Sequence, residues 1–469
     1  MTVSLTSTSR RIASFAALWV AASMARAQSA PPVSGTELDS IVRANFTGKG
    51  IVGLSVGVMQ DGKVVFAKGY GMASLPTNTP VTPATMFPIG SVTKQFTCSA
   101  VLLLAEDGKL HMSDPVARYF PNLTRAKEIT LLDLGQHVSG YRDYYPLDFV
   151  DREMLKDVTA DAIMREYATR PLDFDPGTRW SYSNTNFTIL GAVAEKVSGE
   201  PFGAFLAKRI FTPLGMQHTS FDPPTNGAAT ATGYRSWALG DPTPAQPEGK
   251  GWTGAAGAIW STPTDLLAWD LALVTGRAIS PASYRTLTTA RRLKDGRSTG
   301  YGCGDGVNDV GAAIVLSHGG AVSGSVTQNT VLPASRSAVV LLANSETGLG
   351  ALNNSLVAKL MPQVDVPKVA GLSALDAAKA YLAQLAAGKV DRTTLGDDFR
   401  AHLTPELEKA AAASLVKLGD ITNVQVVGRA ERGGMEVARL RLMVGKVAVS
   451  GSMYRTPDGK IQQVLISRQ

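Results

Sequence analysis

The chain has little of what metal and redox sites require. Its 469 residues include two cysteines and five histidines, and none of them shows the spacing of a zinc motif. Beyond the N-terminus, no apolar run has the length that crosses a bilayer. The formal net charge is +7, without a basic stripe. We therefore expect no metal, no cofactor, no nucleic-acid partner and no stable membrane span, and the sequence leaves the oligomeric state open.

Residues 1–27 have the features of a secretory signal peptide. Arg10 and Arg11 form a basic start, an apolar stretch runs from Ile12 to Ser23, and Ala25-Arg26-Ala27 fits a small-x-small cleavage site. An uncleaved membrane anchor is the alternative, but the apolar stretch is too short to span a bilayer. We expect an exported protein, periplasmic or secreted.

The two cysteines, Cys98 and Cys303, do not by themselves define a disulfide framework. Export would permit a bond between them. Cys98, however, lies on an apolar segment, where a buried free thiol is common. The sequence therefore leaves their pairing open.

The length of the chain predicts two domains, because one hydrophobic core rarely serves so many residues. Residues 28–362 form the first domain and residues 363–371 a linker. In residues 372–469, two helical stretches precede four strand-like runs separated by glycine turns, which predicts a small α+β domain.

Ser91-Val92-Thr93-Lys94 is the stretch around which the first domain is organised. It precedes an apolar run that ends at Asp107-Gly108, which predicts a loop followed by a buried helix. Residues three apart share a helix face, so Lys94 points the same way as Ser91. A desolvated lysine can take the proton of a serine and make it a nucleophile. The ordinary alternative is a serine cap with a solvated lysine.

A second serine matches a nucleophile pattern. Gly53-Leu54-Ser55-Val56-Gly57 fits G-x-S-x-G, whose serine sits on a turn between a strand and a helix. Here a tight turn at Asp61-Gly62 and a second strand follow, which predicts a β-hairpin. We therefore interpret Ser55 as an ordinary strand residue.

Tyr182-Ser183-Asn184 precedes a helix predicted over Phe187 to Val197. In extended backbone the side chains of Tyr182 and Asn184 point the same way. A tyrosine beside a cationic lysine shifts toward phenolate and can relay protons, while an asparagine can hold the lysine and a substrate carbonyl. A buried tyrosine and a turn asparagine are the alternative. His137, at a predicted helix end, is interpreted as a structural histidine.

Strand-like runs follow at Ala312 to Leu316, Ser325 to Leu332 and Ser337 to Leu342. Ser317-His318-Gly319-Gly320-Ala321 lies between the first two. Glycines beside a strand allow the backbone to approach a ligand closely.

Taken in order, Ser91 to Lys94, Tyr182 to Asn184 and His318 to Gly320 resemble the motifs of the serine β-lactamase and penicillin-binding protein family. The nearest branch holds class C β-lactamases, D-Ala-D-Ala carboxypeptidases and S-x-x-K esterases, and the resemblance covers about residues 35–362. It implies an antiparallel sheet flanked by helices, with an all-helical subdomain. The C-terminal domain is similar to NTF2-like domains.

The resemblance also implies roles for individual residues. Ser91 would be the acylated nucleophile, with Lys94 and Tyr182 sharing the role of base. The N–H groups of Ser91 and Ala321 would form the oxyanion hole. The residues implied to bind substrate are Asn184, His318, Gly319, Gly320 and Ala321.

These residues predict a serine hydrolase that forms an acyl-enzyme with an ester, an amide or a short D-amino-acid peptide. The alternative is a penicillin-binding or peptidoglycan-sensing protein that is acylated without efficient turnover. Family members that hydrolyse β-lactams usually carry a lysine and a hydroxyl residue where this chain has His318 and Gly319. Since a largely neutral histidine binds a carboxylate weakly, we expect uncharged or bulky acyl groups and weak β-lactamase activity.

Overall fold

The computed structural model describes residues 30–468, apart from residues 31, 146, 148, 226, 228, 311, 312 and 362–365. The predicted signal peptide lies outside the described residues. The chain divides into two compact units, one that ends at Met361 and one that follows it. Each unit is described by itself below.

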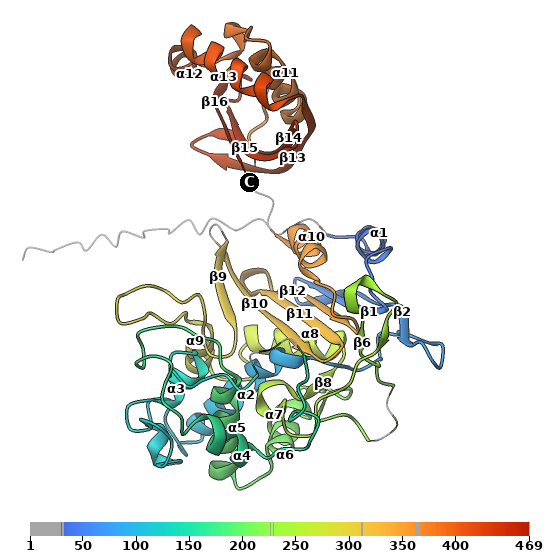
Figure 1. Ribbon diagram of the computed structural model, residues 1–469, viewed down its shortest axis with the longest axis vertical. Helices are drawn as coiled ribbons and strands as arrows, with labels where there is room; N and C mark the ends of the chain where they lie inside the picture. The colour runs from blue at the N-terminus through green and yellow to red at the C-terminus, as the bar shows by residue number, and fades with distance from the viewer. Residues whose placement is uncertain are drawn as a thin grey trace, which may run out of the picture. The chain divides into compact units, whose positions relative to one another are not determined.

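A seven-stranded antiparallel sheet is the centre of the first unit (Figure 1). Its order is β3-β2-β1-β12-β11-β10-β9, so the N-terminal hairpin and the last strands of the unit share one sheet. The prediction of an antiparallel sheet is confirmed. The strands are β1 (Gly53–Gln60), β2 (Lys63–Ser74), β3 (Thr79–Pro80), β9 (Gly306–Val310), β10 (Ala313–Val322), β11 (Ser325–Leu332) and β12 (Ser337–Ala343).

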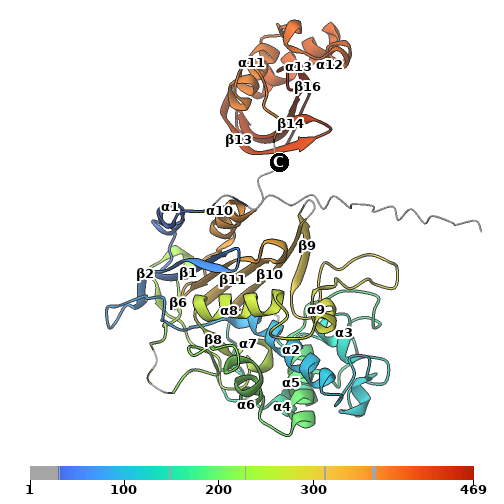
Figure 2. The same ribbon diagram turned by 180° about the vertical axis from the view of Figure 1, so that it is seen from behind.

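Helices cover both faces of this sheet. In Figures 1 and 2, α1 (Gly35–Phe46) and α10 (Gly350–Leu360) lie on one face, and α8 (Pro263–Val274) lies on the other. Every residue of β1 is buried as a result. Ser55 lies in the middle of this strand, which continues through a tight turn into β2. The geometry of a nucleophile elbow is absent at Ser55, as predicted.

The helical part of the unit packs below α8 around α2 (Thr93–Glu106). Twelve of the 14 residues of α2 are buried, because the helix is largely apolar on all sides. Phe96 on α2 stacks on Trp269 of α8 with ring centroids 4.2 Å apart. The helices packed against α2 are α5 (Asn184–Ser198), α6 (Phe202–Leu206), α7 (Gly254–Gly257) and α9 (Pro281–Thr288). Two further helices, α3 (Leu131–Gly135) and α4 (Ala160–Tyr167), pack against α5.

A disulfide joins Cys98 on α2 to Cys303 in the loop before β9, across 205 residues of sequence. The bond answers the question that the sequence left open. An added Cβ at Gly135 would lie 3.0 Å from the Cys98 sulfur, so only glycine leaves room for the bond there.

The second unit has the predicted α+β architecture. Helices α11 (Ala374–Ala386), α12 (Asp397–His402) and α13 (Pro405–Leu418) precede four antiparallel strands in the order β13-β14-β15-β16. The strands are β13 (Ile421–Arg432), β14 (Met435–Val444), β15 (Val447–Arg455) and β16 (Ile461–Arg468). The likeness to NTF2-like domains stays a prediction.

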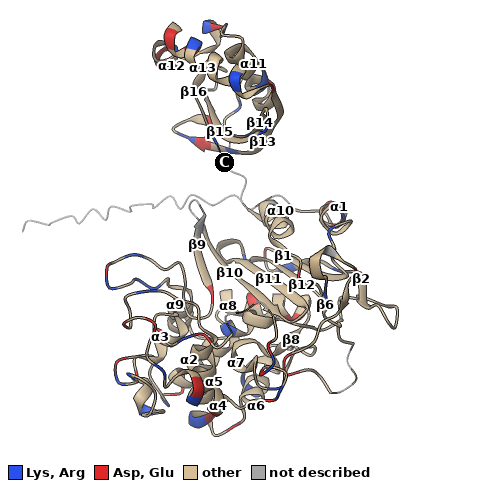
Figure 3. Cartoon of the chain, in the orientation of Figure 1, with Lys and Arg blue, Asp and Glu red and all other residues tan. Residues whose placement is uncertain are grey.

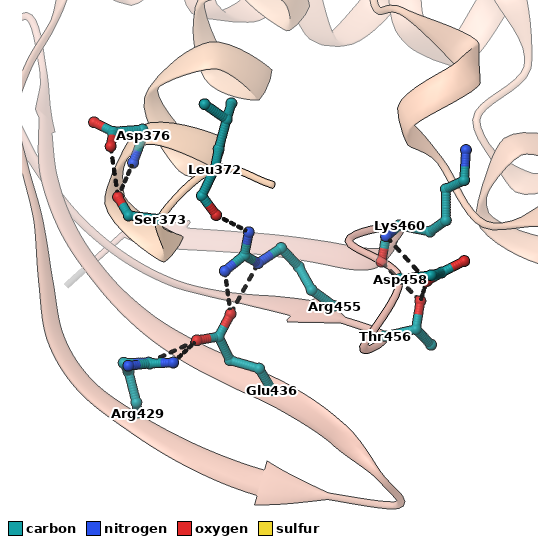
Figure 4. A network of polar contacts seen from close by, with 9 residues as sticks. All are labelled: Leu372, Ser373, Asp376, Arg429, Glu436, Arg455, Thr456, Asp458 and Lys460. Carbon is teal, nitrogen blue, oxygen red and sulfur yellow. Dashed lines mark hydrogen bonds and ion pairs between the residues drawn. The ribbon is translucent and has the colours of Figure 1, made fainter. Parts of the chain in front are cut away.

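A buried ion pair crosses the sheet of the second unit. Figure 4 shows Glu436 between two arginines, with the guanidinium of Arg455 also donating to the carbonyl of Leu372 at 2.7 Å. Glu436 and Arg455 are both almost fully buried. Since Nε, Nη1 and Nη2 of Arg455 all donate within the domain, we interpret this network as structural.

Two features are absent from the part of the chain that the structure describes. None of its helices has the length and apolarity needed to cross a bilayer. Within the same residues, no group of three or more His, Cys, Asp or Glu side chains is arranged to hold a metal ion. Lys and Arg are interspersed with Asp and Glu along the chain (Figure 3).

Candidate active site

Ser91 lies on a short 3₁₀ turn, Gly90–Val92, that leads directly into α2. The turn packs tightly against β10. Gly90 has a positive φ of 51°, and an added Cβ there would lie 2.7 Å from the amide nitrogen of Ala321. An added Cβ at Gly320 would likewise lie too close to the backbone, at 2.0 Å from the carbonyl oxygen of Ile89. Both glycines are needed because the two backbones meet here without intervening side chains.

Lys94 is fully buried behind Ser91. Its Nζ lies 3.1 Å from Ser91 Oγ, 2.8 Å from Asn184 Oδ1 and 2.8 Å from the carbonyl oxygen of Ala256. The alternative of a serine cap with a solvated lysine is therefore wrong. Burial lowers the pKa of Lys94 to about 7, although the negative charge of Asp143 raises it by a smaller amount. At neutral pH a substantial fraction of Lys94 is uncharged and able to accept a proton.

Tyr182 lies beside this amine, with its ring centroid 4.9 Å from Lys94 Nζ. Burial raises the pKa of Tyr182 above its usual value, and the nearby Ser91 hydroxyl offsets only part of that rise. The expected shift toward phenolate is therefore wrong: Tyr182 is a neutral phenol at pH 7. Its buried hydroxyl oxygen has no hydrogen-bond partner of good geometry among the described residues. Such a group is available to donate to a substrate.

Asn184 begins α5 and is oriented by Asp143, which the sequence reasoning missed. The Asp143 carboxylate accepts from the backbone N–H of Asn184 at 2.9 Å and from its side-chain Nδ2 at 3.1 Å. Since a carboxylate only accepts, Asn184 turns Nδ2 toward Asp143 and Oδ1 toward Lys94. Asp143 thus positions the residue that holds the lysine.

His318 lies within β10, so the strand predicted over Ala312 to Leu316 continues through it to Val322. Its Nε2 pairs with the hydroxyl of Tyr301 at 2.8 Å, and its Nδ1 contacts the carbonyl of Gly319 at 2.5 Å. Burial and the nearby Lys94 lower the pKa of His318 to about 4. The imidazole is therefore neutral at pH 7, and Tyr301 occupies one of its two nitrogens.

His137 is structural, as predicted. It is fully buried and accepts from the backbone N–H of Ser183 at 3.1 Å through Nδ1. Its ring lies 4.4 Å from that of Tyr182 and 4.9 Å from that of Tyr301. Burial lowers its pKa well below the usual value. His137 supports the wall of aromatic rings behind Lys94.

Ala321 exposes its backbone at the edge of the sheet. A two-residue turn, Ser323-Gly324, joins β10 to β11, so Val322 and Ser325 form the hydrogen-bonded pair next to it. The N–H of Ala321 then points away from β11. β9 pairs with β10 only as far as Ser317, so this N–H faces the Ser91 turn. An oxyanion hole between Ser91 and Ala321 is compatible with this backbone.

The described site thus brings together the predicted Ser91, Lys94, Tyr182 and Asn184, with the His318 strand at its edge. The family model that describes beta-lactamases matches residues 38–360 of the chain. The chain belongs to the beta-lactamase family. The family prediction made from the three motifs is confirmed.

Proteins that are similar to this chain in sequence include two named D-aminopeptidase. One from Brucella anthropi is 33% identical over 300 residues, which cover 63% of this chain and 56% of that protein. One from Gluconobacter oxydans is 28% identical over 430 residues, covering 91% of this chain and 80% of that protein. The chain therefore spans little more than half the length of the first of these relatives.

A solved structure shows the same fold. The D-amino acid amidase from Ochrobactrum anthropi SV3, complexed with L-phenylalanine amide, superposes with a TM-score of 0.59 and 24% identity. The superposition covers 69% of this chain and 97% of the amidase. This likeness confirms the predicted fold of the first unit.

Proposed function

We propose that this protein is a serine hydrolase that forms an acyl-enzyme on Ser91 and cleaves amides or short peptides of D-amino acids. One observation carries the proposal: the buried amine of Lys94 lies 3.1 Å from Ser91 Oγ and has a pKa of about 7. Acyl transfer needs a nucleophile within hydrogen-bond reach of a base. The base must also be partly uncharged at neutral pH, as Lys94 is.

In the acylation step, Ser91 Oγ bonds to the substrate carbonyl carbon while its proton passes to neutral Lys94. The backbone N–H groups of Ser91 and Ala321 stabilise the oxyanion. The neutral Tyr182 hydroxyl gives its proton to the leaving amine and regains one from Lys94, so that the amine departs without net charge on the site. Water then attacks the ester on Ser91, and the protons move in the reverse order. Water gives a proton to Tyr182 as Tyr182 gives one to Lys94, and Lys94 returns a proton to Ser91 Oγ.

Two observations support an amide of a D-amino acid over a β-lactam. The relatives from Brucella anthropi and Gluconobacter oxydans are both named D-aminopeptidase. In addition, His318 is neutral and bound to Tyr301, so it offers no fixed cation to a substrate carboxylate. Esters of similar acyl groups remain substrates in this proposal, because the acylation step is the same for both.

Intact-mass measurement tests the proposal. The protein is incubated with a D-amino-acid amide, a p-nitrophenyl ester, a D-Ala-D-Ala peptide and a cephalosporin. We expect turnover of the amide and the ester and weak turnover of the cephalosporin. A stable mass increase without product release would instead support the alternative of a protein acylated once and not regenerated.

The pH dependence of turnover should follow Lys94. Below its pKa of about 7 the amine is charged and cannot accept the proton of Ser91. We therefore expect kcat/KM for an uncharged ester to rise about tenfold per pH unit below pH 7 and to level off above it. A steady-state profile from pH 5 to 9 measures this. A profile that keeps rising to pH 9 would mean that Lys94 has an ordinary lysine pKa.

We also propose that the protein works outside the cytoplasm. The predicted signal peptide over residues 1–27 and the disulfide between Cys98 and Cys303 support this, because disulfides persist in oxidising compartments.

A further inference from the structure

A cavity of about 670 Å³ opens beside the Ser91 turn. It is lined by Pro88, Gly257 and Val322 near the turn and by Ser323 and Glu248 further out. Gly257 marks where the cavity meets the site, since an added Cβ there would lie 3.6 Å from the carbonyl carbon of Gly90. The cavity therefore begins next to the nucleophile and ends at a carboxylate.

Glu248 is held at this end by one of its two oxygens. Its Oε1 accepts from the hydroxyl of Tyr145 at 2.7 Å and from the backbone N–H of Ser323 at 3.0 Å. Its Oε2 has no hydrogen bond with the described residues. Glu248 is half-buried, so this second oxygen is a fixed acceptor at the wall of the cavity.

Two cations lie near Glu248, and each of them acts on another carboxylate. The guanidinium of Arg235 donates to both oxygens of Glu346, at 2.7 to 3.0 Å. Lys250 also lines the cavity, where its charge acts on Asp222. Arg235 ion-pairs with Glu346, and the charge of Glu248 acts on Arg235 as well. A half-buried carboxylate with one oxygen left to accept favours a cation brought by the ligand.

The position of Glu248 matches the acyl side of a substrate. Ser323 follows Ala321 by two residues, a separation of about 7 Å along a strand. The acyl carbonyl oxygen would lie at the Ala321 N–H, and the ammonium group of an aminoacyl substrate lies within a few bonds of it. We propose that Glu248 is a specificity residue that binds an ammonium group on the acyl side of the substrate. This inference rests on the proposed function and refines it.

Kinetics with p-nitroanilides that differ in the ammonium group test the inference. The probes are D-alanine, glycyl-D-alanine, N-acetyl-D-alanine and propionyl p-nitroanilide, the last two without a charge. Glu248→Gln keeps the acceptor for Tyr145 and Ser323 but removes the negative charge. We expect kcat/KM to fall about 10- to 100-fold, mainly through KM, for the charged probes and less than about threefold for the neutral ones.

Glu346→Gln is the matched control. Glu346 accepts from the backbone N–H of Gly324, in the same turn, at 3.1 Å, but it does not line the cavity. This variant should leave the preference for charged probes unchanged. A larger loss with the D-alanine probe would place the ammonium on the residue next to the scissile bond. A larger loss with the glycyl-D-alanine probe would place it on the second residue.

Two results would overturn the inference. An equal loss on charged and neutral probes in Glu248→Gln would mean that Glu248 only holds the turn in place. No loss on any probe would mean that the ammonium binds elsewhere. Failure of the wild-type protein to hydrolyse every probe, or to be acylated by it, would instead reject the proposed function on which the inference rests.

Discussion

Replacing Ser91 with alanine is expected to abolish acylation by every substrate, with a loss of turnover on the order of 10⁴-fold or more. No other described hydroxyl is hydrogen-bonded to the amine of Lys94. Ser91 is partly exposed at a helix start, so the variant should keep its fold and thermal stability. Intact mass after incubation with an ester measures acylation, and circular dichroism measures the fold.

Ser55→Ala is the control for this experiment. Ser55 is fully buried in β1 and its hydroxyl has no hydrogen-bond partner among the described residues. Removing it should change turnover by no more than a few-fold. Substantial turnover by Ser91→Ala, or loss of activity in a stably folded Ser55→Ala, would show that the nucleophile has been assigned to the wrong residue.

Lys94→Ala and Tyr182→Phe should each lower kcat by about 10²–10⁴-fold, the range seen when a general base or acid is removed. The two side chains act on the same proton path, so their effects should not add in the double variant. Lys94→Ala also leaves a buried space and removes the donor to Asn184 and Ala256. Lys94→Met therefore serves as a second variant that restores most of the volume.

A double-mutant cycle with one ester substrate measures the coupling between the two residues. The expected result is a double variant about as slow as the slower single variant. Losses that multiply would mean that Lys94 and Tyr182 act on separate protons, and the path proposed above would then be wrong. Melting temperatures of the four proteins separate a loss of activity from a loss of folded protein.

Local patterns in the sequence predicted much of this site. The spacing of Ser91 and Lys94 puts both on one helix face, and the hairpin at Asp61-Gly62 excludes Ser55. Tyr182 and Asn184 were found because they precede the helix predicted from Phe187, although the helix in the structure already begins at Asn184. Each of these signals involves residues that are close in the chain.

Long-range contacts could not be predicted in this way. Asp143 reaches Asn184 across 41 residues, and Tyr145 reaches Glu248 across 103. No periodicity marks either pair. The predicted direction of the pKa shift of Tyr182 was wrong because the sequence does not show the burial that raises this pKa. The short strand β9 was missed as well, since its glycine and asparagine are poor strand formers.

The disulfide between Cys98 and Cys303 has a consequence for proteolysis. The loop that it closes contains most of the helical part of the first unit, including Tyr182 and Asn184. A protease that cuts one peptide bond within this loop yields two fragments that stay covalently joined through sulfur. The nicked protein keeps its full mass until a reductant is added, so its integrity has to be judged on reducing gels.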